Sequence, residues 1–193
     1  MDNPFLKAIF VQPRAVLGRE LLPFSAYHAA ALMLVDSPFM AGGNVELDDL
    51  VLATYICSMD STDGPTHLFP ELDGDGLLEW GLSLGGFDLT EELEVFGAHM
   101  EDYLDFPELW QPSGEKGKAS GIPWPVYCVT SVLQNMRGVT EYEAWNMPLA
   151  KLVAYKCAIA EQNGSEVISE AQRNQIKWLK LQEVAAKEEH GDS

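Results

Sequence analysis

The chain has 193 residues, 47% of them hydrophobic and 22% charged, so it is long enough to form a globular domain with a sizeable core. Its formal net charge of −18 is concentrated in residues 1–109, which hold 3 Lys and Arg against 20 Asp and Glu, whereas residues 110–193 hold 9 against 10. A field of that sign repels phosphate backbones and anionic lipids, which argues against nucleic-acid and membrane partners. Basic protein surfaces and metal cations are favoured partners, and solubility is the simpler explanation of the charge.

The most apolar stretch, residues 17–39, is too broken to span a membrane. A spanning helix needs about 20 consecutive apolar residues, but Pro23 and His28 interrupt this run and residues 36–38 end it. The three cysteines show no C-x-x-C spacing, and the N-terminus lacks the pattern of a secretion signal. We therefore expect a cytoplasmic protein with reduced thiols.

A short extended segment, residues 1–20, precedes the first predicted helix. That helix begins near Pro23, with Ser25 or the proline in its first turn, and ends at residues 36–38 because proline keeps the preceding residue out of the α region. One face of this helix is mainly apolar and is predicted to be buried. This face comprises Phe24, His28, Ala31, Leu32 and Val35.

Two further helices are predicted in the acidic half, on either side of a long excursion. The second helix carries an apolar stripe of Leu47, Leu50, Val51, Thr54 and Cys57. Residues 59–86 are rich in Gly, Asp and Pro, which indicates a long acidic loop with one short helix at Leu77–Trp80. The third helix runs from Asp88 to Leu104, with Asp88 as its cap and Glu91 three residues on.

The second half begins with residues 110–122, whose Gly, Ser and Lys content indicates a flexible connection. A helix is predicted over residues 126–136. Thr140 and Glu143 form a capping-box pattern that opens the next helix, and Pro148 predicts a kink or a late helix start, because an interior proline costs about 3 kcal/mol.

Asn163-Gly164 predicts a left-handed C-terminal cap for that helix. A last helix over residues 165–187 has apolar side chains on more than one face, which indicates docking between two surfaces or onto a partner.

These elements predict a mainly α fold. We expect an irregular bundle of five to six helices with a short extended N-terminal segment and a long acidic loop excursion. The predicted division is an acidic helical part, residues 1–109, a flexible linker or loop, residues 110–122, and a C-terminal helical part, residues 123–193, with one compact domain as the alternative.

Two patterns in the acidic region resemble functional motifs. Ser83 lies in a G-x-S-x-G pattern, but this nucleophile turn requires a preceding strand and a partnering histidine further on, and His99 and His190 are the only later histidines. A Gly-rich loop is therefore the favoured interpretation. Asp73 and Asp75 have the spacing of a calcium loop, but the twelfth position is a leucine instead of the bidentate glutamate, so they are weak metal candidates in a solvated turn.

Four side chains on the predicted helices have a structural interpretation beside a functional one. We expect His28 to be a buried neutral histidine bonded to a backbone carbonyl, and Cys57 to act as a small hydrophobe. His99 lies beside the apolar stripe of its helix. Lys156 shares the predicted helix face of Trp145, which its aliphatic stem explains, although a carboxylate on a partner is the alternative.

Two segments carry a family resemblance. "LGRELLPFSAYHAAALMLVDSPFMAGG…DDLVLATYICS" resembles an N-terminal pattern of proteins encoded among the tail genes of tailed bacteriophages, through Gly18-Arg19, Pro23-Phe24-Ser25, His28, Ser37-Pro38-Phe39 and Cys57-Ser58. "GVTEYEAWNMPLAKLVAYKCAIAEQNG" resembles the second half of such proteins. Together they cover about a third of the chain.

The resemblance implies a non-enzymatic tail assembly chaperone, or a tail-associated assembly protein, in the cytoplasm of the bacterial host. Such a protein covers an apolar helical partner such as the tape-measure protein and helps to recruit tail-tube subunits; no cofactor is expected, and the sequence allows a homo-oligomer. Two alternatives are a divalent-cation-dependent enzyme that uses the acidic region 59–105, and a general helical protein-binding module.

The predicted partner-binding surface lies on the last two helices, where helix-in-groove contacts need an exposed apolar stripe. It comprises Trp145, Leu149, Leu152, Lys156, Trp178 and Leu181.

Overall fold

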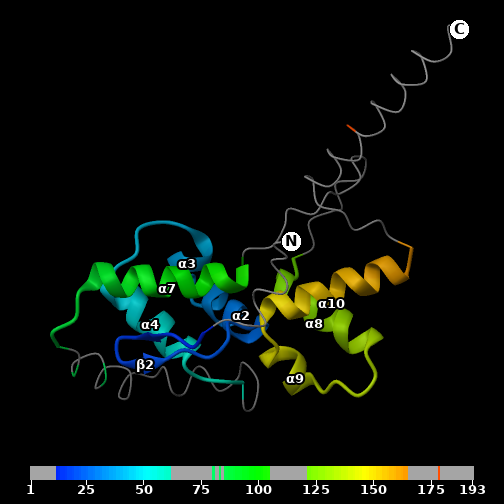
Figure 1. The fold of residues 1–193 in the computed structure, drawn as a ribbon, viewed down its shortest axis with the longest axis horizontal. Coiled ribbons are helices and arrows are strands. Elements are labelled where there is room, and N and C mark those ends of the chain that lie inside the picture. Colours follow the sequence, from blue (N-terminus) through cyan, green and yellow to red (C-terminus); the bar gives the residue numbers. More distant parts are fainter. Residues whose placement is uncertain are drawn as a thin grey trace, which may run out of the picture. The chain divides into compact units, whose positions relative to one another are not determined.

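The computed structural model describes residues 12–61, 85–104 and 121–164, together with Trp80, Ser83 and Trp178. Over these residues the fold is mainly helical, with seven helices and one two-stranded sheet, which confirms the predicted fold class (Figure 1). Most of the predicted acidic excursion, most of the predicted linker and most of the last predicted helix lie outside the described residues.

The chain divides into two compact units. The first contains Met1–Phe106 and Ser120–Lys156, and the second contains Pro107–Ala119 and Cys157–Ser193. Nearly all of the described residues belong to the first unit, and the fold and the sites below are those of that unit.

The predicted extended N-terminal segment contains a hairpin of β1 (Ala15–Val16) and β2 (Arg19–Glu20), paired antiparallel with Val16 opposite Arg19. Leu17 and Gly18 form the turn, with φ of 49° and 76°. Two successive left-handed residues match the twist of a hairpin, but a leucine there is strained. The Leu17 N–H donates to a Glu92 carboxylate oxygen at 2.8 Å, so a distant side chain holds the turn.

Helix α2 (Ala26–Leu34) lies at the centre of the first unit and contacts the helices α3 (Pro38–Ala41), α4 (Leu47–Cys57), α8 (Trp124–Asn135) and α9 (Glu141–Asn146). Its neighbours bury more than the single face that the sequence predicted, because Ala26, Tyr27 and Ala29 are also buried. A helix covered on several sides tolerates few polar side chains, which explains why this is the most apolar stretch of the chain.

Helix α2 ends as predicted, close to Asp36, which has a left-handed φ of 51°. Pro38 then opens the short helix α3 instead of only ending α2, because a proline at the first helical position loses no hydrogen bond. On α4 the predicted stripe is buried except for its first residue, Leu47, which is 38% exposed.

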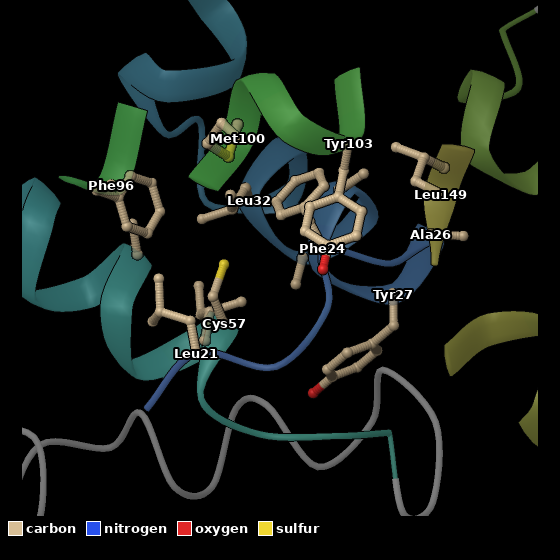
Figure 2. Packing of buried hydrophobic residues seen from close by; sticks show 14 of the residues in the cluster. Leu21, Phe24, Ala26, Tyr27, Leu32, Cys57, Phe96, Met100, Tyr103 and Leu149 are labelled. Atoms are coloured by element: carbon tan, nitrogen blue, oxygen red, sulfur yellow. The ribbon is translucent and has the colours of Figure 1, made fainter. Parts of the chain in front are cut away.

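Helix α7 (Leu89–Leu104) begins as predicted at Asp88, whose carboxylate accepts hydrogen bonds from the backbone N–H groups of Thr90 and Glu91. Its buried side chains are Phe96, His99, Met100 and Tyr103. Figure 2 shows Phe96, Met100 and Tyr103 directed from α7 toward residues of α2 and α4.

The helix predicted to run from Thr140 to Asn163 is two helices, α9 and α10 (Leu149–Gln162). The Thr140–Glu143 capping box and the left-handed Gly164 after α10, with φ of 85°, are confirmed. Pro148 lies between the helices, in an isolated bridge with Ser25, and the Leu149 N–H donates to the Phe24 carbonyl at 2.8 Å. The break is stronger than the predicted kink because proline removes one backbone donor and keeps the preceding residue extended.

One hydrophobic core joins residues from both sides of the predicted linker (Figure 2). It takes side chains from the hairpin, α2, α4 and α7 as well as from α8, α9 and α10. No helix among the described residues is both long and apolar enough to cross a bilayer.

Candidate functional site

The residues predicted to bind a partner on α9 and α10 differ in burial. Leu149 and Leu152 are fully buried, and Trp145 is partly buried against the core. Lys156 is exposed near the buried thiol of Cys128. The face on which Trp145 and Lys156 were placed together assumed one continuous helix; they lie on two helices, so that part of the interpretation was wrong.

The two partner-binding residues predicted on the last helix lie further along the chain. Trp178 is 57% exposed, and Leu181 lies outside the described residues. The two leucines of α10 therefore belong to the core, and among the described members of the predicted surface Lys156 and Trp178 are exposed.

A cluster of exposed apolar side chains lies at the start of α8, where no site was predicted. Ile122, Trp124 and Tyr127 are 52%, 37% and 42% exposed. Trp124 and Tyr127 are three residues apart and therefore share a helix face, with Ile122 just before the helix. We call these three residues the α8 patch. The available signal was three large apolar residues within six positions, directly after a polar connection.

His28 is a fully satisfied buried histidine. Its Nδ1 accepts from the Ser25 N–H at 3.1 Å, so Nε2 carries the proton and donates to the Met59 carbonyl at 2.7 Å. The Ser25 hydroxyl accepts from the His28 N–H in return, which makes a capping box with histidine in the place of glutamate. Burial lowers the pKa of His28 to about 4, partly opposed by its hydrogen bond to Met59. The predicted neutral histidine bonded to a backbone carbonyl is confirmed.

Hydrogen bonds to the segment Met59–Ser61, which follows α4 in the chain, link α2 to α9. Beside the His28 contact to Met59, the Tyr142 hydroxyl donates to Asp60 at 2.8 Å. The Ser61 N–H donates to the Asn146 side-chain oxygen at 2.9 Å, and the Asn146 amide donates to the Ser61 hydroxyl at 3.1 Å. These contacts have a structural role, because every polar side chain in them bonds to another part of the fold.

His99 is equally buried, but the described residues provide no hydrogen-bond partner for either of its ring nitrogens. Its ring lies among the rings of Phe24, Phe96 and Tyr103, at centroid distances of 6.4, 6.3 and 5.3 Å. Burial lowers the pKa of His99 to about 4, and the charges of His28 and Arg14 act in the same direction. The nearby Leu22 carbonyl raises the pKa of His99, but its position does not meet the geometry of a hydrogen bond.

Polar contacts flank His99 along α7. Arg14 donates from Nε and one terminal nitrogen to a single Asp102 oxygen, at 3.1 and 2.5 Å, with both side chains about one third exposed. Glu92, nearer the other end of the helix, accepts from the Leu17 N–H. Both donors come from the hairpin region, so α7 is fastened along one side.

Arg19, the other basic residue that the structure describes in the acidic half, also contacts neighbouring side chains. The Arg19 guanidinium lies 4.8 Å from the ring centroid of Tyr55 and 4.5 Å from that of Trp80, and it donates to the Ser58 hydroxyl at 3.2 Å. Asp102 engages Arg14, and most of the other carboxylates described in this half are exposed.

The structure describes few of the residues proposed for the enzyme alternative. The Ser83 hydroxyl donates to the Trp80 carbonyl at 2.7 Å, three residues earlier, as in a local helical turn. Asp73 and Asp75 lie outside the described residues. Within the described ranges, no group of three or more His, Cys, Asp and Glu side chains is arranged to hold a metal ion.

Cys57 lies at the end of α4 and is fully buried, and burial raises the pKa of its thiol far above the ordinary value. A thiol that resists ionisation is a poor nucleophile, in agreement with its predicted place in the core.

Searches of protein-family models, of curated proteins and of solved structures found no match to this chain.

Proposed function

We propose that this protein is a non-enzymatic binding protein that covers an apolar helix of another polypeptide, and that it acts as a phage tail assembly chaperone with the tape-measure or tail-tube protein as its partner. The α8 patch carries the proposal, because three large apolar side chains are exposed within six residues. Exposed apolar clusters with Trp and Tyr are typical of protein-binding sites.

The patch suits a helical partner because of its shape and chemistry. Trp124 and Tyr127 have large apolar rings with one polar atom each, and such side chains bury much area on binding while keeping a hydrogen bond. Their i, i+3 spacing along α8 presents a ridge that packs into the groove of a second helix. Trp178, a member of the predicted surface, is also exposed.

The family part of the proposal depends on two segments that lie about 80 residues apart in the sequence yet are in contact. Phe24 and Ser25, from the first resembling segment, meet Pro148 and Leu149, from the second, through one bridge and one backbone hydrogen bond. Residues that define a junction of this kind are expected to recur together in proteins with the same arrangement of helices. The contact shows that the two segments form one junction of the fold, and the family part of the proposal rests on their sequence resemblance.

The negative charge supports a role as a carrier of apolar chains. A net charge of −18 keeps a complex with an aggregation-prone helix in solution, and it attracts a partner with basic residues beside its apolar stripe.

Co-expression with a helical tape-measure fragment, followed by size-exclusion chromatography, tests the proposal. The wild-type chain is expected to co-elute with the fragment, and Trp124→Ala is expected to abolish co-elution because it removes the central side chain of the patch. Leu34→Ala is the control, since Leu34 is an exposed apolar side chain outside the α8 patch. Separate elution of the wild-type chain and the fragment would contradict the proposal, as would equal loss in both variants.

A further inference from the structure

Helix α7 packs against the core through Phe96, Met100 and Tyr103, and its buried face also carries a polar side chain. In the middle of its apolar face, His99 is 2% exposed, and neither of its ring nitrogens has a hydrogen-bond partner among the described residues. An unpaired buried polar group favours any state in which solvent or another molecule supplies the missing hydrogen bond.

The elements beneath α7 carry further unpaired groups. The hydroxyl oxygens of Ser37, which precedes α3, and Thr54, on α4, are buried without a hydrogen-bond partner in the described part of the chain. Both α3 and α4 pack against α7, the former through ring contact between Phe39 and Phe96 at 4.5 Å. The two elements that pack against α7 therefore also carry buried polar atoms without a hydrogen-bond partner among the described residues.

The outer side of α7 is unfavourable in charge. Glu91 and Glu94 are exposed three residues apart, where like charges on a helix repel each other, and Glu101 is exposed further along. A helix with neutral or basic side chains at these positions would fit the same face with less repulsion from the surrounding carboxylates.

We propose that α7 is a displaceable cover, and that the face beneath it is a docking site for an amphipathic helix of a partner protein. We call this surface the α7-covered face: the rings of Phe24 and Phe39, with the Leu17 N–H and the Arg14 guanidinium as donors at its side. The inference rests on the proposed function, because it identifies a second surface through which the chain holds an apolar helix.

The contacts of α7 itself define the occupant. A fitting helix has apolar residues at the spacing of Phe96, Met100 and Tyr103, and carboxylates at the positions of Glu92 and Asp102 that reach the two donors. Its remaining outer positions are neutral or basic. Such a helix exchanges for α7 by the helix-in-groove mode.

A peptide probe tests the docking site on the full chain. The probe is a fluorescent peptide of residues 88–104 in which E91K, E94K and E101K replace the exposed glutamates; the control peptide carries F96S in addition. We expect the probe to bind Glu92→Gln about tenfold more tightly than the wild-type chain, because the variant weakens a charge-assisted hydrogen bond that holds α7. Glu94→Gln removes the same charge from an exposed position and relieves repulsion within α7, so it is expected to bind the probe no more tightly than the wild type does.

Amide hydrogen exchange measures the opening directly. We expect the amides of α7 to exchange faster than those of α2, and His99→Leu to slow exchange in α7 about tenfold while leaving α2 unchanged. The same variant is expected to bind the probe more weakly than the wild type. Circular dichroism of each variant confirms that it is folded.

Equal probe affinity for the Glu92→Gln, Glu94→Gln and wild-type chains would overturn the inference, as would equal exchange rates in α7 and α2. Binding of the F96S peptide as tight as the probe would also overturn it. If the probe does not bind while a tape-measure fragment still co-elutes, the docking site beneath α7 is contradicted and the proposed function is not. If the probe binds as expected while the fragment elutes separately, the cover stands and the tail-assembly function is lost.

Discussion

Two buried histidines border Phe24, and their surroundings are opposite. His28 uses both ring nitrogens and thereby joins α2 to the segment after α4. His99, on α7, has neither nitrogen bonded to another described residue. Equal burial therefore does not mean an equal contribution to stability, because the free energy of a buried polar group depends on its hydrogen bonds. The difference separates a junction whose polar groups are hydrogen-bonded from a helix that buries one without a partner among the described residues.

The largest expected effect is acid destabilisation, which acts on both histidines. Burial lowers each pKa from 6.5 to about 4, so the unfolded state binds more protons between these values and the free energy of unfolding falls as the pH drops from 6.5 to about 4. The expected loss is about 3 kcal/mol for each histidine, and it is absent above pH 6.5. Urea unfolding at pH 7, 6, 5 and 4.5 measures it. A flat profile over this range would contradict the burial of neutral histidines.

Phe24→Ala removes the side chain that both histidines contact. We expect a loss of about 4 kcal/mol in the free energy of unfolding, because Phe24 is fully buried and its removal leaves a cavity. Thermal and urea unfolding measure the loss, with Leu34→Ala as the exposed control. A loss below 1 kcal/mol would show that the junction around Phe24 is not central to the core.

His28→Leu removes the histidine whose two ring nitrogens are both hydrogen-bonded. The substitution leaves the buried Ser25 N–H and the partly buried Met59 carbonyl without their partner, and we expect a loss of about 3 kcal/mol. It should also lessen the acid dependence described above. Urea unfolding at pH 7 and pH 5 separates the two effects, and an unchanged stability at pH 7 would show that these hydrogen bonds contribute little.

His99→Leu makes the same substitution at the histidine that has no hydrogen-bond partner among the described residues. The expected effect on the free energy of unfolding is opposite to that of His28→Leu. Since an apolar side chain of similar size replaces a group without hydrogen bonds, the free energy of unfolding should rise by about 1 kcal/mol. Urea unfolding at pH 7 measures the rise. A loss of stability as large as that of His28→Leu would show that His99 stabilises the fold as His28 does, so the two histidines would not differ in this respect.

Arg14→Gln has the smallest expected effect. The ion pair with Asp102 is about one third exposed on both sides, so we expect a loss of about 0.5 kcal/mol that shrinks at high salt. Unfolding in 0.05 M and 1 M NaCl, two ionic strengths on either side of strong screening, measures it. A loss that is independent of salt would mean that packing of the arginine stem, and not its charge, fastens α7.

The local features of the fold were predictable, and the site was not. Asp88, the Thr140–Glu143 box and Gly164 mark helix ends, and each was recognised because a cap depends on residues within four positions. Pro148 was recognised as a disturbance, but the size of the break depended on Ser25 and Phe24, more than a hundred residues earlier. The α8 patch was missed because exposure depends on what the rest of the chain covers.

By itself the sequence determined the helical class, the helix ends, the charge imbalance and the absence of a long apolar run in residues 17–39, because these depend on composition and on short spacings. Only the tertiary structure decided that α2 would be buried on several sides, and that His28 would find Met59, 31 residues later, while His99 would find no partner in the described part of the chain. The physical reason is that burial and hydrogen-bond satisfaction are properties of neighbours in space, and those neighbours come from distant parts of the chain.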